Sequence, residues 1–154
     1  MSLKLEGGCL CKAVRFTLKA KSLPFVVCHC RDCQYASGGG PTYVLAVPRE
    51  GVNVSNGEES IRSFSSLSDS GHDVTRQFCF ICGSHLFELL QLRPGIKLVR
   101  VGALDDPSGL QIDATVWITS AQPWAYVDPG TRLFDRNPEP LLDSKNRWVR
   151  PSRS

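Results

Sequence analysis

Seven cysteines lie in three tight clusters along this chain of 154 residues: Cys9 and Cys11, then Cys28, Cys30 and Cys33, then Cys79 and Cys82. Thiolates are preferred zinc ligands, and a Cys-x-x-Cys turn supplies two of them from one bend. Cysteines that only fill a core would instead be buried singly on apolar faces. The clustering therefore predicts a metal-binding protein.

The number of cysteines also bears on the compartment. Seven thiols cannot all pair as disulfides within one chain, and residues 1–8 contain no apolar stretch typical of a signal peptide. Thiols stay free for metal binding or chemistry in a reducing compartment. We therefore expect a cytoplasmic protein without disulfides.

The spacing allows two ways of dividing the cysteines between metal sites. Cys30 and Cys33 could join Cys79 and Cys82, as in many zinc ribbons, which leaves Cys28 with the first cluster. In the other partition, the first and third clusters form a four-cysteine site and leave Cys28, Cys30 and Cys33 together. Three protein ligands with an open fourth position are typical of catalytic zinc. Spacing slightly favours this second partition, because three ligands so close in sequence can cap one face of a metal.

Composition excludes several classes of protein. The chain is 42% hydrophobic and 21% charged, which is ordinary globular usage and excludes a largely disordered chain. No apolar run approaches the length of about 18 residues that a membrane span needs. The net charge of +3 is small and scattered, which argues against nucleic-acid binding. We expect one soluble domain.

Short strands separated by turns dominate the pattern, with little helical periodicity. Val14, Phe16 and Leu18 alternate with polar residues, as in a half-buried strand. The strands expected on such grounds are 14–19, 25–27, 42–47, 61–64, 74–78, 85–90, 96–101 and 114–119. We expect a turn at 53–57, a loop at 65–71 and at most a helical turn after Cys33.

Three segments together resemble a known family. They are Gly8-Cys9-Leu10-Cys11, the segment from Cys28 to Gly38 (CHCRDCQYASG), and the segment from Phe78 to Phe87 (FCFICGSHLF). The chain from about Leu5 to Pro140 resembles the glutathione-dependent formaldehyde-activating enzymes. That family also includes centromere protein V-like proteins and shares a fold with Mss4-type zinc proteins.

The resemblance implies the fold and the ligand sets. It implies a mainly β, Mss4-like single domain of short antiparallel sheets with little helix, over residues 1–140, followed by a basic C-terminal tail over 141–154. It also implies two Zn²⁺ ions per chain. A structural zinc would be held by Cys9, Cys11, Cys79 and Cys82, and a catalytic zinc with an exchangeable fourth ligand by Cys28, Cys30 and Cys33.

The reaction implied by the resemblance joins formaldehyde to glutathione, giving S-hydroxymethylglutathione, and is classed as a carbon–sulfur lyase reaction. A free thiol has a pKa near 8.5, so binding its sulfur to zinc would favour the nucleophilic thiolate. The expected partners are therefore a small-molecule thiol and an aldehyde, with neither a membrane nor nucleic acid.

Supporting groups are harder to select. His29 could shuttle a proton or could point away, and the N–H groups of residues 37–40 could bind an oxyanion or form a turn. A glutathione carboxylate calls for an arginine, and no spacing distinguishes Arg15, Arg31, Arg62 and Arg76. We expect His72 and His85 to be structural or solvated, and Trp117 and Trp124 to serve in the core or as cover.

Two other functions compete with the enzyme. A non-catalytic two-zinc module that binds protein or nucleic acid would have its second metal fully ligated. A redox sensor would use the three close thiols to lose metal and oxidise reversibly.

Overall fold

The structure is a computed structural model, which describes residues 2–138. The basic tail predicted for residues 141–154 lies outside the described residues. Among the described residues the single α-helix is α1 (Arg31–Ser37), and short 3₁₀ helices lie at Arg49–Gly51, Glu58–Ser60, Val101–Ala103 and Ile118–Ser120. The strands are β1 (Leu3–Gly8), β2 (Arg15–Ala20), β3 (Phe25–Cys28), β4 (Thr42–Pro48), β5 (Val52–Asn56), β6 (Ile61–Leu67), β7 (Asp73–Cys79), β8 (His85–Leu90), β9 (Ile96–Arg100), β10 (Ala114–Val116) and β11 (Arg132–Leu133).

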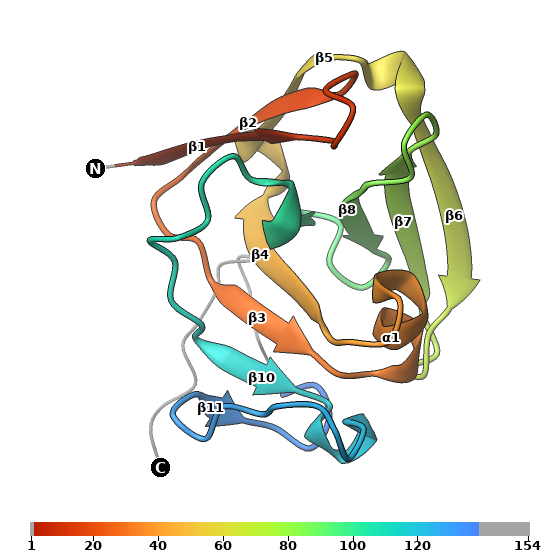
Figure 1. The fold of residues 1–154 in the computed structure, drawn as a ribbon, viewed down its shortest axis with the longest axis vertical. Coiled ribbons are helices and arrows are strands. Elements are labelled where there is room, and N and C mark those ends of the chain that lie inside the picture. Colours follow the sequence, from red (N-terminus) through yellow and green to blue (C-terminus); the bar gives the residue numbers. More distant parts are fainter. Residues whose placement is uncertain (1, 139–154) are drawn as a thin grey trace.

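The strands form two sheets of different size. A three-stranded sheet has the order β1-β2-β5, and an eight-stranded sheet has the order β11-β10-β3-β4-β9-β8-β7-β6. Figure 1 shows β1 and β2 side by side near the top of the view, with α1 following β3 along the chain. The predicted mainly β fold with little helix is confirmed.

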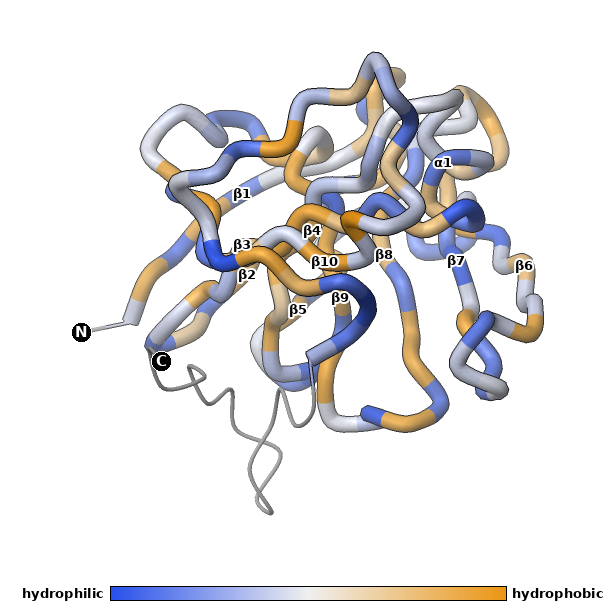
Figure 2. Tube along the Cα trace, turned by 90° about the horizontal axis from the view of Figure 1, so that it is seen from below, coloured by the Kyte–Doolittle hydropathy of each residue, from blue (hydrophilic) through white to orange (hydrophobic). Residues whose placement is uncertain are grey.

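The core lies between the two sheets. Phe16 and Leu18 of β2 meet Leu45 and Phe87 of the larger sheet, and the rings of Phe16 and Phe87 pack edge to face with centroids 5.1 Å apart. Alternation along β2 places these apolar side chains on one face. Figure 2 shows hydrophobic stretches gathered in central strands such as β3 and β4. The other face of the larger sheet is thereby left to line a separate space.

The turn expected at 53–57 is mostly a strand. Val52 and Val54 alternate with polar residues and pack against the core, so β5 pairs with β2 up to Asn56. Only Gly57 turns the chain, with φ 79°. A Cβ at Gly57 would lie 1.9 Å from the carbonyl oxygen of Ala13, so both the conformation and the space require glycine.

The loop expected at 65–71 begins later than predicted. β6 continues to Leu67 because residues 61–67 pair one for one with β7. The hydroxyls of Ser65 and Thr75 add a cross-strand hydrogen bond of 2.7 Å. Serine content suggested a loop, but pairing with the neighbouring strand overrides that local preference.

The strand expected at 114–119 ends early, and its pairing is not antiparallel. β10 runs parallel to both β3 and β11, so the larger sheet is mixed. The strand stops at Val116 because Trp117 adopts a left-handed conformation with φ 58°. A 3₁₀ turn over Ile118–Ser120 follows. Within residues 2–138, no helix has the length and apolar character needed to cross a bilayer.

Candidate metal centres and the cleft beside them

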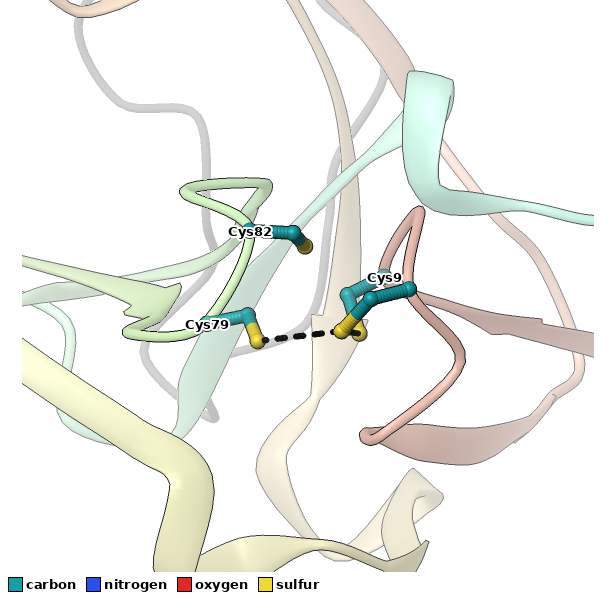
Figure 3. Close-up of side chains that lie close together, drawn as sticks. Cys9, Cys79 and Cys82 are labelled. Carbon is teal, nitrogen blue, oxygen red and sulfur yellow. Dashed lines mark hydrogen bonds between the residues drawn. The ribbon is translucent and has the colours of Figure 1, made fainter.

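The first and third cysteine clusters meet in space. Cys9 and Cys11 lie in the turn after β1, and Cys79 and Cys82 lie where β7 turns into β8. The four sulfurs lie within 4.8 Å of one another. Figure 3 shows the sulfurs of Cys9, Cys79 and Cys82 directed towards one common space. The four side chains therefore tie the small sheet to the hairpin of the larger one.

The sulfur spacings suit a tetrahedral ion. The sulfurs of Cys9 and Cys11 are 3.5 Å apart, and those of Cys11 and Cys79 are 3.8 Å apart. A tetrahedral zinc with bonds of about 2.3 Å places neighbouring sulfurs about 3.8 Å from each other. The four-cysteine group therefore fits zinc by both distance and donor type.

Backbone N–H groups and one hydroxyl form hydrogen bonds around these sulfurs. The Val14 N–H donates to the Cys9 sulfur at 3.2 Å. The Ser84 hydroxyl lies 3.2 Å from the Cys82 sulfur, and this contact is the main reason that the pKa of Cys82 falls to about 5. Gly83 makes the turn with φ 77°, and its N–H donates to the Cys79 carbonyl at 2.8 Å. The turn thus presents sulfur in a form that binds metal.

The middle cluster forms a second group by itself. Cys28 ends β3, while Cys30 and Cys33 lie at the start of α1, and the three sulfurs lie within 4.8 Å of one another. Cys30 caps the helix, since its sulfur accepts from the Cys33 N–H at 3.4 Å. Thr42 donates its hydroxyl to the Cys33 sulfur at 3.1 Å. The sulfurs are thus grouped four and three, and not as a zinc ribbon.

The three thiols influence one another strongly. Hydrogen bonds from Cys28 and then Cys33 lower the pKa of Cys30 to about 3. The hydrogen bond to Cys30 is the largest cause that raises the pKa of Cys28, and the hydrogen bond to Cys33 is the next largest. Thiols this close to one another can share a soft cation that replaces their protons. The donor set again fits zinc, here with three protein ligands.

A buried glutamine fixes the backbone around this second group. Gln34 is 3% exposed, and its amide nitrogen donates to the carbonyl of His29 at 2.7 Å and to that of Ser120 at 2.9 Å. Its amide oxygen accepts from Gln122 at 3.0 Å and from Arg31. These bonds connect the segment between Cys28 and Cys33 to the 3₁₀ turn after β10.

A cleft of about 340 Å³ opens beside the three sulfurs. The three cysteines lie at its lining, and its floor is the face of the larger sheet that turns away from the core. The floor is mainly apolar, and its apolar side chains include Val26, Val44, Ala46, Leu90, Ile96 and Leu98. The three-cysteine group therefore adjoins a space where a small molecule can lie.

Two buried charges form an ion pair at this face. Arg100 Nη2 lies 2.5 Å from Glu88 Oε1, with their side chains 9% and 5% exposed. Burial raises the pKa of Glu88, while the charges of Arg100 and Arg76 oppose that rise. An ion pair this deeply buried is costly to break from one side, because the remaining charge has no water to solvate it.

We expect Glu88→Gln to lower the free energy of unfolding by about 3–5 kcal/mol, because it leaves the Arg100 guanidinium buried without its counter-ion. Urea unfolding of the zinc-loaded protein measures this. The control is Glu59→Gln at an exposed position, which should change the free energy by less than about 0.5 kcal/mol. Equal effects would mean that the buried pair contributes nothing particular to stability.

Comparison with known proteins identifies the family. The family model of the glutathione-dependent formaldehyde-activating enzymes matches residues 4–120, which is most of the chain. This chain belongs to that family. The match includes all seven cysteines and most of the cleft floor, so both groups of sulfurs lie within the region that defines the family.

A solved structure is similar in fold. It is the crystal structure of a Rhodobacter sphaeroides protein, 17% identical in sequence, with a TM-score of 0.55. The alignment covers 84% of this chain and 99% of that one. A search of curated protein sequences finds no significant match. The structural likeness therefore supports the fold of this family member.

Several of the groups that the sequence suggested as supporting the chemistry have positions that fit a structural role. His29 is 1% exposed and does not line the cleft. The N–H groups of Gly38 and Gly39 both donate to the Gln34 carbonyl, so these two groups end the helix and are already engaged. His85 is partly buried and its ring lies 5.9 Å from that of Phe78.

The two tryptophans differ in environment. Trp117 is 9% exposed, lines the cleft, and donates from Nε1 to Asn137 at 2.9 Å. Trp124 is 78% exposed, so it is not part of the core. His72 lies in the turn between β6 and β7 at the edge of the cleft.

Sequence reasoning missed three residues that shape the site: Gln34, Thr42 and Glu88. Gln34 directly follows Cys33, but nothing in the spacing shows that its amide bonds to Ser120. Thr42 lies opposite Cys28 in the β3–β4 pair, which a register prediction could have shown. Glu88 lies within an apolar strand, and a lone acid in such a strand is a signal of a buried polar contact.

Proposed function

We propose that this protein is a zinc-dependent carbon–sulfur lyase or synthase that forms or cleaves the adduct of glutathione, or a related thiol, with formaldehyde or a similar aldehyde. The observation that carries the proposal is a three-sulfur group that fits zinc and adjoins a cleft. A fully ligated structural site needs no adjoining cleft. Family membership supports the same chemistry.

The two groups of cysteines have different proposed roles. Cys9, Cys11, Cys79 and Cys82 would hold a structural zinc, because four thiolates leave no position open. Cys28, Cys30 and Cys33 would hold a catalytic zinc. When bound there, zinc supplies a positive charge that favours the thiolate form of a thiol ligand.

The chain's own residues then prepare the addition. The three cysteines orient the site, and Thr42 holds the Cys33 sulfur through its hydroxyl. The apolar floor excludes water from the space where aldehyde and thiolate meet, so the two are held close together. The thiol proton leaves to solvent, a carbon–sulfur bond forms, and the carbonyl oxygen takes up a proton. No oxidant is needed.

Seven free thiols also fit a reducing compartment, and we propose a cytoplasmic location on that basis. Thiols that bind two zinc ions would lose that capacity if they were oxidised.

The test measures the exchange rate between free glutathione and its formaldehyde adduct by NMR exchange spectroscopy, because the uncatalysed addition already proceeds. We expect zinc-loaded protein at micromolar concentration to raise the rate at least about tenfold, which corresponds to about 1.4 kcal/mol of barrier. Protein stripped of zinc by a chelator serves as the control. An unchanged rate with loaded protein would remove this substrate assignment.

A further inference from the structure

The cleft has a second polar region besides the three sulfurs. Arg76 of β7 pairs with Glu88 of β8, Glu88 pairs with Leu98 of β9, and Leu98 pairs with Ala46 of β4. All four side chains line the cleft. Since paired strands lie about 4.8 Å apart, this row spans about 14 Å between β4 and β7.

The sulfurs adjoin the end of β3 and the start of β4, whereas Arg76 lies on β7. Thr42, which bonds to Cys33, shares its face of β4 with Val44 and Ala46. The cleft therefore extends across the sheet from the thiols to Arg76. A one-carbon aldehyde occupies only a small part of such a space, so most of the cleft is available to the thiol substrate.

Arg76 has few partners for a buried cation. Arg76 is 8% exposed. Its one hydrogen bond to a described residue is donated by Nη1 to the Ser66 hydroxyl at 3.4 Å. Its Nε atom is buried and lacks a hydrogen-bond partner within residues 2–138. A guanidinium has five donors, and buried donors are normally satisfied. Arg76 is therefore equipped to bind something further.

The nearby acids do not satisfy Arg76. Glu88 directs its Oε1 to Arg100 at 2.5 Å, so two guanidiniums share one buried carboxylate. Asp69 and Asp73 are exposed at the cleft edge, and neither forms an ion pair with Arg76 in the described part of the chain. The buried group thus carries a net positive charge, which a bound anion would neutralise.

The other candidate arginines are engaged elsewhere. Arg15 pairs with Asp105, and Arg31 bonds to Gln34 beside the exposed ring of Tyr35. Arg62 donates to the Glu59 carbonyl at 2.8 Å. None of these three arginines lines the cleft, whereas Arg93 and Arg136 line it without being buried as Arg76 is.

We propose that Arg76 binds a carboxylate of the thiol substrate, so that the cleft selects thiols whose carboxylate lies several bonds away from the sulfur. The guanidinium fork presents parallel N–H donors that match both oxygens of a carboxylate. This inference rests on the proposed function in one respect: the thiol's sulfur lies at the three-cysteine end.

The test measures thiol binding to zinc-loaded protein by calorimetry, without any aldehyde. The ligands are glutathione and its analogues in which the glycine carboxylate, the glutamyl α-carboxylate or both are carboxamides. Loss of the carboxylate that Arg76 binds should weaken binding about 10- to 100-fold, which is typical of a charge-assisted hydrogen bond. The single amides show which carboxylate it is.

Variants then connect the selectivity to the residue. Arg76→Gln should weaken glutathione binding by the same factor and leave binding of the diamide unchanged. Arg76→Lys keeps the positive charge but not the forked pair of N–H donors. Its affinity for glutathione should therefore lie between that of Arg76→Gln and that of the unmodified protein. Arg62→Gln removes an exposed arginine of the neighbouring strand and should bind glutathione as the unmodified protein does.

Each result of these measurements either supports or overturns the carboxylate-binding role of Arg76. Equal affinity for glutathione and its diamide in the unmodified protein overturns the proposal, even if Arg76→Gln fails to fold. An Arg76→Gln variant that folds and still prefers the carboxylate also overturns it. If carboxylate selectivity is present but the protein does not raise the exchange rate between glutathione and its formaldehyde adduct, the proposed reaction fails while the binding role of Arg76 stands.

Discussion

Cys79→Ser should unfold the chain or destabilise it severely. Cys79 is fully buried at the end of β7, and its sulfur is one of four that connect the turn after β1 to the β7–β8 hairpin. A structural zinc of this kind contributes about 10–16 kcal/mol of binding free energy, which is as large as the whole stability of an ordinary domain. Removing one ligand therefore removes much of what holds the two sheets together.

Far-UV circular dichroism and thermal unfolding, together with zinc analysis, measure this loss. The matched control is Ile81→Ser, which lies in the same turn but is 57% exposed and contributes no ligand. We expect that control to remain folded with about two zinc ions per chain. A Cys79→Ser protein with unchanged unfolding temperature would contradict a structural role for the four-cysteine group.

Cys30→Ser should release the second zinc and abolish catalysis of adduct formation while the protein remains folded. The core between the two sheets does not include Cys30, which packs with the smaller cluster beside Trp117. Serine is also a preferred helix N-cap, so its hydroxyl can accept the Cys33 N–H in place of the sulfur. The substitution therefore removes a metal ligand with little effect on α1.

Zinc analysis should give about one ion per chain for Cys30→Ser, against about two for the unmodified protein. The exchange rate between glutathione and its formaldehyde adduct should fall to the uncatalysed value, and the unfolding temperature should change by a few degrees at most. If Cys30→Ser unfolds as completely as Cys79→Ser, both groups are structural, and the non-catalytic two-zinc module becomes the better description.

Local patterns predicted the strands well where side-chain alternation and cross-strand pairing agree. β2 and β4 are such cases. β2 alternates apolar and polar residues, and β4 concentrates apolar residues beside clear turn residues. β5 and the end of β6 were missed, since asparagine and serine suggested turns. Their pairing with β2 and β7 stabilises them as strands, and a partner strand is invisible in a single window of sequence.

The parallel position of β10 could not be predicted for a related reason. Its partner β3 lies more than 80 residues earlier in the chain, and neither strand contains a residue that specifies the other. The early end of β10 depends on Trp117, whose left-handed conformation is unusual for a large side chain. Sequence propensity favours continuing the strand at that point.

The cysteine spacing by itself predicted groups of thiols that could hold a metal, because ligands within one turn are close in space whatever the rest of the chain does. The resemblance to the family then supplied the pairing of clusters. Only the tertiary structure decided that Arg76, alone among the four arginines considered from the sequence, lines the cleft, and that Glu88 is buried on the neighbouring strand. Arg76, Glu88 and Thr42 come from three strands, and their place in one cleft depends on the pairing of those strands in one sheet.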